Sequence, residues 1–166
     1  MKKFLLISGL VCLFALTDLS AQHYKTGIGF RFNSYNSGGL TVKHFISGSS
    51  ALEGIFTSPW GRGWNLTGLY EIEKSISDVD GLAWFFGFGG HLGMWPADYA
   101  PWKYNGWVPP GSSYMVIGAD GILGLEFTIP NAPITFQLDW KPAFNIIGYT
   151  GFWPNNGGIS VRYAIK

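Results

Sequence analysis

Apolar residues alternate with polar or small residues along most of the chain that follows residue 21. The last nine residues show the pattern clearly, because Ile159, Val161, Tyr163 and Ile165 alternate with Ser160, Arg162 and Ala164. A period of two is that of a β-strand with one apolar face. Clusters of Gly, Asn, Asp, Ser and Pro interrupt the pattern at short intervals, and no segment of this part has a helical period. We expect eight strands, at about Thr26–Asn33, Gly39–Ser47, Ala51–Ser58, Trp64–Lys74, Leu82–Trp95, Tyr114–Ile129, Ile134–Gly148 and Gly158–Lys166.

Pro142 interrupts the seventh of these strands. Before it, Ile134, Phe136, Leu138 and Trp140 oppose Thr135, Gln137, Asp139 and Lys141. Proline cannot donate a hydrogen bond to a neighbouring strand. We therefore expect a bulge or a kink at Pro142.

The connections between the strands differ in length. The predicted second, fourth and sixth strands are followed by Ser47–Ser50, Ser75–Gly81 and Pro130–Pro133, which are short. The other connections are Ser34–Gly38, Ser58–Gly63, Pro96–Ser113 and Tyr149–Gly157, and they include the longest. Short turns on the side of the termini and longer loops on the other are typical of outer-membrane barrels.

The size of the side chains indicates which face of the sheet is inside. The interior of an eight-stranded barrel is just wide enough to be filled by side chains. Large aromatic residues gather on one face of the expected strands, while Gly, Thr, Ser and single charges gather on the other. We therefore predict an all-β fold, an eight-stranded antiparallel up-and-down transmembrane β-barrel with its bulky side chains in lipid. A secreted, soluble lipocalin-like ligand-binding barrel, with its apolar residues inside, is the alternative.

Charged residues of both signs fall on the expected inner face. They are Arg31, Lys43, Lys141 and Arg162 with Glu53, Glu71, Asp120, Glu126 and Asp139. Charges in a narrow space of low dielectric constant must be paired. We expect a network of salt bridges that plugs the barrel; a proton or ion path is the alternative.

Aromatic residues lie near the expected strand ends and in the adjoining loops. This set contains Trp60, Trp64, Trp84, Trp95, Tyr99, Trp102, Tyr114, Tyr149, Phe152, Trp153 and Tyr163. Such rings settle at the headgroup level of a membrane, where they form girdles. The same residues would serve as core aromatics in a soluble β-protein.

The first 21 residues have the organisation of a secretory signal peptide. Lys2 and Lys3 precede an apolar run from Phe4 to Leu16, and small residues lead to a cleavage point after Ala21. The run is shorter than the roughly 20 residues that a membrane-spanning helix needs. We expect residues 1–21 to be a signal peptide and residues 22–166 to form the barrel domain.

The remaining chain has an unusual composition. It has no cysteine and carries nine basic and nine acidic residues, so it offers no basic surface for nucleic acid. Over the whole chain 24 residues are glycine, 17% are aromatic and only 13% are charged. Soluble domains carry about 25% charged residues. The composition favours a membrane barrel.

No constellation of residues indicates catalysis. A lipid A-modifying enzyme would need Ser, His and a carboxylate on one strand face, yet His44 and Ser47 fall on opposite faces. His91 has Gly89 and Gly93 as its neighbours on the same face, and His23 lies at the start of the mature chain. We expect a protein that is not an enzyme and that has no catalytic residue, cofactor or metal site.

The longest connection, Pro96–Ser113, is the candidate for interaction with a partner. It holds Tyr99, Trp102, Tyr104 and Trp107, and three prolines limit its flexibility. Exposed aromatic residues on a stiff loop bind glycan, protein or the membrane surface. The alternative, which we favour, is that these residues belong to the outer girdle or cover the mouth of the barrel.

The chain from His23 to Lys166 resembles the small OmpA/OmpX-type outer-membrane barrels, and it is most similar to the short forms of Bacteroidetes. The segments that carry the resemblance are Gly27–Arg31, Leu40–Phe45, Ala51–Gly54, Asp120–Glu126 and Leu138–Asn145. The resemblance implies location in the cell outer membrane, contact with outer-membrane lipid and lipopolysaccharide, and insertion by the outer-membrane assembly machinery. That machinery reads an amphipathic last strand, which Val161, Tyr163 and Ile165 would provide. The family often ends in an aromatic residue, whereas this chain ends in Lys166.

Overall fold

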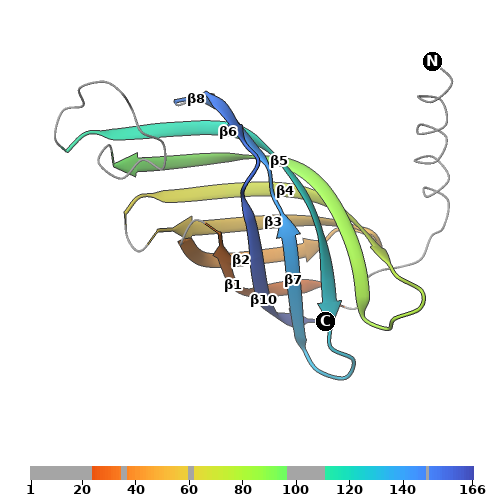
Figure 1. Cartoon of the computed structure of the whole chain (residues 1–166). Helices are drawn as coiled ribbons and strands as arrows, with labels where there is room; N and C mark the ends of the chain where they lie inside the picture. Colours follow the sequence, from red (N-terminus) through yellow and green to blue (C-terminus); the bar gives the residue numbers. More distant parts are fainter. Residues whose placement is uncertain (1–23, 35–36, 60–61, 97–110, 149) are drawn as a thin grey trace, which may run out of the picture.

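The computed structural model describes residues 24–34, 37–59, 62–96, 111–148 and 150–166 (Figure 1). Regular structure in this part of the chain consists of strands alone. They are β1 (Thr26–Asn33), β2 (Ser37–Phe45), β3 (Ser50–Ser58), β4 (Trp64–Ser75), β5 (Leu82–Pro96), β6 (Ser113–Thr128), β7 (Ile134–Trp140), β8 (Ala143–Ile147), β9 (Gly151–Trp153) and β10 (Gly157–Ile165). No helix among the described residues is long and apolar enough to cross a membrane. The expected signal peptide, residues 1–21, lies outside the described residues.

The strands close into a ring. From β1 to β6 each strand pairs antiparallel with the next along the chain. β6 then pairs with β7 and β8, β9 pairs with β8, and β10 pairs with both β7 and β1. Because β7 and β8 are two halves of one wall strand, and β9 and β10 two halves of the next, the fold is a closed eight-stranded antiparallel β-barrel. The predicted barrel architecture is confirmed.

The predicted strand bounds agree with the structure to within two residues, except at the start of the last wall strand, which begins with β9 and not at Gly158. One short strand was not predicted. Gly151–Trp153 was expected inside a loop but pairs with β8 as β9, with Phe144 opposite Phe152. Gly and Pro residues lie on both sides of this segment, so the sequence there shows no alternation that would indicate a strand.

The bulge expected at Pro142 is present, and it lies on the side of β9 and β10. The backbone N–H of Lys141 donates to the carbonyl of Asn156 at 2.6 Å, whereas Ala143 stands opposite Trp153. Pro142 alone therefore faces both Pro154 and Asn155, which is one extra residue on the opposing strand. On the other side the ladder continues without a shift, because the Gly121 N–H donates to the Pro142 carbonyl at 2.9 Å. The N–H and C=O of one residue in an antiparallel strand point to the same neighbour, so the N–H that Pro142 lacks is one that would face Gly121 on β6.

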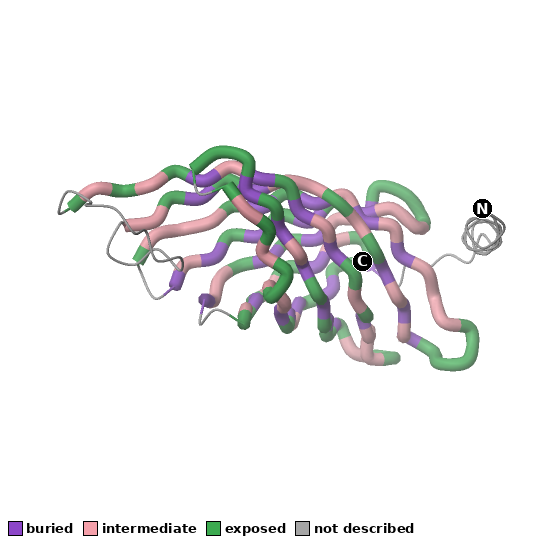
Figure 2. Tube along the Cα trace, turned by 45° about the horizontal axis from the view of Figure 1, so that its top comes forward, coloured by how far each residue is buried: buried purple, intermediate pink, exposed green. Residues whose placement is uncertain are grey.

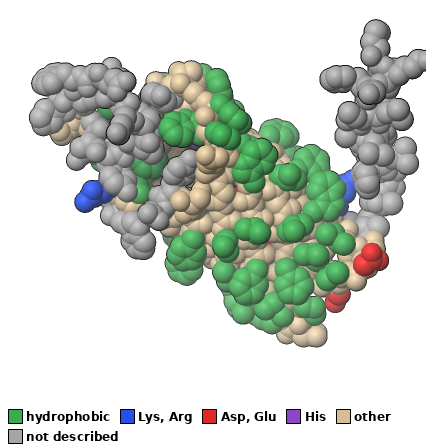
Figure 3. Space-filling view, in the orientation of Figure 1, with side chains coloured by type: hydrophobic (Ala, Val, Ile, Leu, Met, Phe, Trp, Pro, Cys, Tyr) green, Lys and Arg blue, Asp and Glu red, His purple; other side chains and the backbone are tan. Residues whose placement is uncertain are grey.

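Burial alternates along the strands, as the tube in Figure 2 shows. Leu138 is 60% exposed, while its neighbours Gln137 and Asp139 are 1% and 6% exposed. Large apolar side chains face outward on all eight wall strands, including Ile28, Leu40, Leu52, Leu66, Phe88, Leu123, Leu138 and Ile159. On the face seen in Figure 3, hydrophobic side chains cover the wall and charged ones appear only toward its ends. The expected orientation of the two faces is confirmed.

Inward-facing glycines allow adjacent strands to approach closely. A Cβ atom built on Gly39 would lie 1.8 Å from the carbonyl oxygen of Phe56, and one built on Gly29 would lie 1.9 Å from that of Val161. The atoms in the way belong to the backbone, which cannot turn aside as a flexible side chain would. Glycine at these positions is therefore a condition for the tight curvature of the small barrel.

We predict that Gly39→Ala lowers the free energy of unfolding by at least about 1–3 kcal/mol, because the added methyl group meets the Phe56 backbone. Urea titration of the refolded protein measures the loss. Gly54→Ala is the matched control, since a Cβ atom there meets nothing within 4 Å. Equal stability of the two variants would contradict this account of the curvature.

Candidate functional site in the charged barrel interior

Charged and polar side chains fill the interior of the barrel. All nine charged residues predicted to face inward are buried, none being more than 6% exposed. Two further ionisable side chains, Glu73 and His91, are buried with them. The network of paired charges expected from the sequence is therefore present, and it forms three groups.

The first group, the Lys43–Arg162 cluster, joins these two cations to Glu53, Glu71, Glu73 and Glu126. The Arg162 guanidinium donates to Glu53, to Glu126 Oε2 at 3.1 Å and to Gln137 Oε1 at 2.7 Å. The Lys43 ammonium lies 2.5 Å from Glu73, 3.0 Å from Glu126 and 3.1 Å from Glu71. Because β2, β3, β4, β6 and β10 each contribute charged residues, the cluster connects opposite walls of the barrel.

The second group is the pair of Arg31 on β1 and Asp139 on β7. Two guanidinium nitrogens donate to the two carboxylate oxygens, at 2.6 and 2.7 Å. The Arg31 Nε atom donates to Asn33 at 2.7 Å, and Gln137 donates to Asp139 at 2.9 Å. A bidentate pair with further partners is the strongest form of a buried ion pair.

The third group surrounds His91 on β5, nearer the loop end of the barrel. Asp120 lies 2.7 Å from His91 Nδ1 and also accepts from the Lys141 ammonium. The Asn145 side-chain oxygen lies 3.0 Å from His91 Nε2. Both ring nitrogens therefore have partners, and neither is directed at a hydroxyl group. This arrangement orients the imidazole but supplies no nucleophile to activate.

The sequence did not reveal the partners of His91. Asp120 comes from β6, which pairs with β5, and Asn145 comes from β8, which pairs with the far side of β6, so both reach His91 only through the register between strands. Inspection of single strands could place His91 on the inner face but could not find its neighbours. Only an alignment of the neighbouring strands in register would have placed Asp120 and Asn145 near His91.

A small apolar layer lies within the same interior. Tyr24, Phe45, Ala51 and Ala164 pack together beside the short turns, and the Tyr24 and Phe45 rings meet edge-on at 5.2 Å. Phe85 is fully buried and the Lys43 ammonium lies 4.6 Å from the centre of its ring. The expectation that the large aromatic residues lie outside is wrong for these rings, which take the room that the inward glycines leave.

The structure describes only part of the other predicted features. Trp64, Trp84, Trp95, Tyr114, Phe152, Trp153 and Tyr163 of the expected girdles are described, and all keep some exposure. Trp60, Tyr99, Trp102 and Tyr149 lie outside the described residues, as do residues 97–110 of the candidate interaction loop.

Within the described ranges, no group of three or more His, Cys, Asp or Glu side chains could hold a metal ion.

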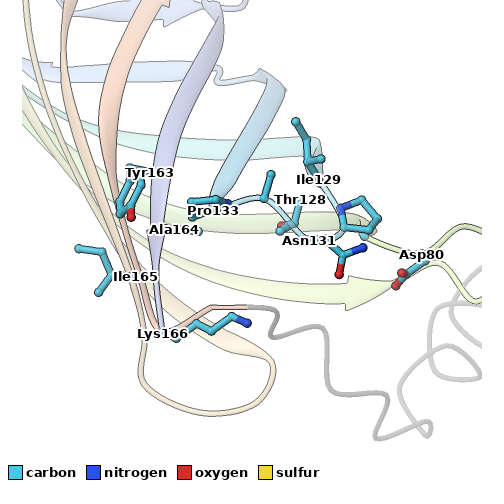
Figure 4. A pocket seen from close by; sticks show the side chains of 12 residues that line it. Asp80, Thr128, Ile129, Asn131, Pro133, Tyr163, Ala164, Ile165 and Lys166 are labelled. Atoms are coloured by element: carbon cyan, nitrogen blue, oxygen red, sulfur yellow. The ribbon is translucent and has the colours of Figure 1, made fainter.

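A cavity of about 600 Å³ opens at the turn end of the barrel, between the β6–β7 turn and the end of β10 (Figure 4). Pro130, Asn131 and Pro133 line one side, and Tyr163 and Lys166 line the other. Asp80 and Lys166 are the charged residues of its lining. The cavity is an open notch in the rim and is separate from the charged groups of the interior.

Comparison with known proteins adds no family assignment. No protein-family model matches the chain, and no curated protein matches it. The class is therefore defined by the structure, as a closed eight-stranded antiparallel barrel with a charged interior and an apolar outer wall.

We predict that Arg162→Met lowers the free energy of unfolding by about 3–5 kcal/mol, because Glu53 and Glu126 lose a buried partner. Lys25→Met, at an exposed basic residue, should change it by less than about 0.5 kcal/mol. Denaturant titration of both variants measures the difference. Similar small effects would mean that the network contributes little to folding.

We also predict that the protein, inserted into planar lipid bilayers, shows no steady ion conductance. Arg162, Lys43 and Phe85 occupy the lumen together, and each is fully buried. A lasting open state in single-channel recordings would contradict a filled lumen.

Proposed function

We propose that the protein is a non-enzymatic integral barrel of the cell outer membrane, similar to the OmpA/OmpX type. Its side-chain-filled lumen has a structural role. Its loops, at the end opposite the short turns, serve for interaction with partners outside the cell.

The observation that carries the proposal is the reversed polarity of the barrel. Leu138 and Phe88 are 60% and 66% exposed on the outer wall, whereas Arg31 and Lys43 are fully buried inside. A soluble barrel has the opposite arrangement, with water outside and an apolar interior. An apolar wall of this extent is unfavourable in water and is the surface that a lipid bilayer requires.

The closed sheet is also suited to a lipid bilayer. Lipid offers no hydrogen-bond partners, so every backbone group in it must be satisfied by the protein. The pairing of β5 with β6 and of β1 with β10 closes the ring, and among the described strands only the short β9 at the loop end pairs on one side alone, with β8. Closure of this kind is one of the two ways in which a chain can span a bilayer.

The proposed partners follow from this location. Outer-membrane lipid and lipopolysaccharide would contact the wall, and the outer-membrane assembly machinery would insert it after export by the signal peptide, residues 1–21. The loop at residues 96–113, with its aromatic residues, is our candidate for a protein or glycan partner. We assign no catalytic role to the His91–Asp120 pair, because Asn145 occupies the ring nitrogen that would face a substrate.

We predict that Leu123→Arg makes folding into lipid vesicles less favourable by about 2–4 kcal/mol, the cost of arginine near the bilayer midplane. Leu123 lies near the middle of β6 and is 49% exposed. Val79→Arg is the matched control, since Val79 is 45% exposed but lies in the turn between β4 and β5. Urea titration in vesicles measures both variants.

Fractionation of cells that express the full chain completes the test. The proposal requires that detergent, and not salt or alkaline buffer, extracts the protein from the outer membrane. Recovery in the soluble fraction, with equal stability of the two arginine variants, would instead support the soluble lipocalin-like barrel.

A further inference from the structure

The Lys43–Arg162 cluster contains more acid than base. Two cations, Lys43 and Arg162, stand among four carboxylates, and all six side chains are at most 3% exposed. Arg31, another cation of the interior, is already held by both oxygens of Asp139. Excess negative charge in a water-poor interior is costly unless a further positive charge enters. At least one more cation or proton is therefore needed to compensate the negative charge of the cluster.

The deficit falls on two of the four carboxylates. Both oxygens of Glu126 have donors, from Tyr24, Lys43 and Arg162, and Glu73 accepts from Lys43. In contrast, Glu53 Oε2 and both side-chain oxygens of Glu71 accept no hydrogen bond from any described residue. The Lys43 ammonium is 3.1 Å from Glu71 but donates to Glu73 and Glu126.

The strand register places these two carboxyl groups next to each other. Glu71 on β4 pairs with Ala51 on β3, and Glu53 lies two residues further along β3 on the same inner face. Such diagonal neighbours are within reach of long side chains. The register thus brings the Glu53 and Glu71 carboxyl groups within reach of each other, although two carboxylates have no hydrogen to share.

We propose that Glu53 and Glu71 form a proton-binding site inside the barrel. One proton, taken from solvent when the barrel folds, makes Glu71 a neutral acid whose hydroxyl donates to Glu53. Glu53 remains ionised, because its other oxygen accepts from Arg162 and from Thr41. The proton converts one Glu71 oxygen into a hydroxyl group, and this hydroxyl group donates to Glu53 Oε2. It also removes one negative charge from the cluster.

Infrared spectroscopy of the refolded full chain at neutral pH tests the site directly. A protonated carboxyl has a C=O stretching band distinct from the carboxylate bands. The wild-type minus Glu71→Gln difference spectrum should contain the protonated-acid band. The wild-type minus Asp120→Asn spectrum should contain carboxylate bands only, because both Asp120 oxygens have cationic or imidazole partners. Carboxylate bands alone in the first spectrum would show that a cation, not a proton, fills the site, and would overturn the proposal.

A stability comparison provides the second measurement. Glutamine keeps the shape of a neutral acid and can donate to Glu53, so Glu71→Gln should fold and keep the wild-type urea midpoint. Glu126→Gln removes a carboxylate that accepts from Tyr24, Lys43 and Arg162, and should lower the midpoint. Failure of Glu71→Gln to fold, or a loss equal to that of Glu126→Gln, would show that Glu71 acts as an ion-pair partner of Lys43. Neither readout depends on the barrel being in a membrane, so the proposed function is tested separately.

Discussion

The pairing of β5 with β6 and of β1 with β10 closes the sheet, and this closure sets the conditions for the rest of the molecule. An eight-stranded ring encloses a space that only side chains can fill. Where neighbouring strands approach most closely, as at Gly29 and Gly39, not even a methyl group fits. The remaining space is occupied by side chains that reach across to the opposite wall, chiefly Arg162 and Lys43.

Closure also explains why a charged interior can be stable. Each buried charge costs free energy, and only an ion pair with further hydrogen bonds offsets it. Arg31 obtains this from Asp139 and Asn33, and Arg162 from Glu53, Glu126 and Gln137. Because the partners come from different strands, the ion pairs can form fully only when the ring is closed. The polar network thus stabilises the interior, as an apolar core does in a soluble protein. It also links the strands of the wall in one register.

The sequence was sufficient to predict the strands and the faces, since both are local properties. A period of two decides that Leu138 and Asp139 point in opposite directions, whichever strand lies beside them. It did not predict β9, whose three residues are too few to show a period, or the inward rings of Phe45 and Phe85. It also could not pair His91 with Asp120 and Asn145, or Glu53 with Glu71, because those contacts depend on the register between strands. The inventory of charges was therefore predictable, and their connections were not.

The two faces of the wall constrain each other. A shift of β6 by one residue would move Leu123 and Leu125 into the lumen and place Asp120 and Glu126 outside. In the bilayer that we propose as its surroundings both changes are unfavourable, so there the outer apolar wall and the inner ion pairs would select the same register. Within that register the acid excess of the Lys43–Arg162 cluster falls on Glu53 and Glu71, where donors are missing. The proton that we propose for this pair follows from the register between β3 and β4, in which Glu71 stands opposite Ala51, two residues from Glu53.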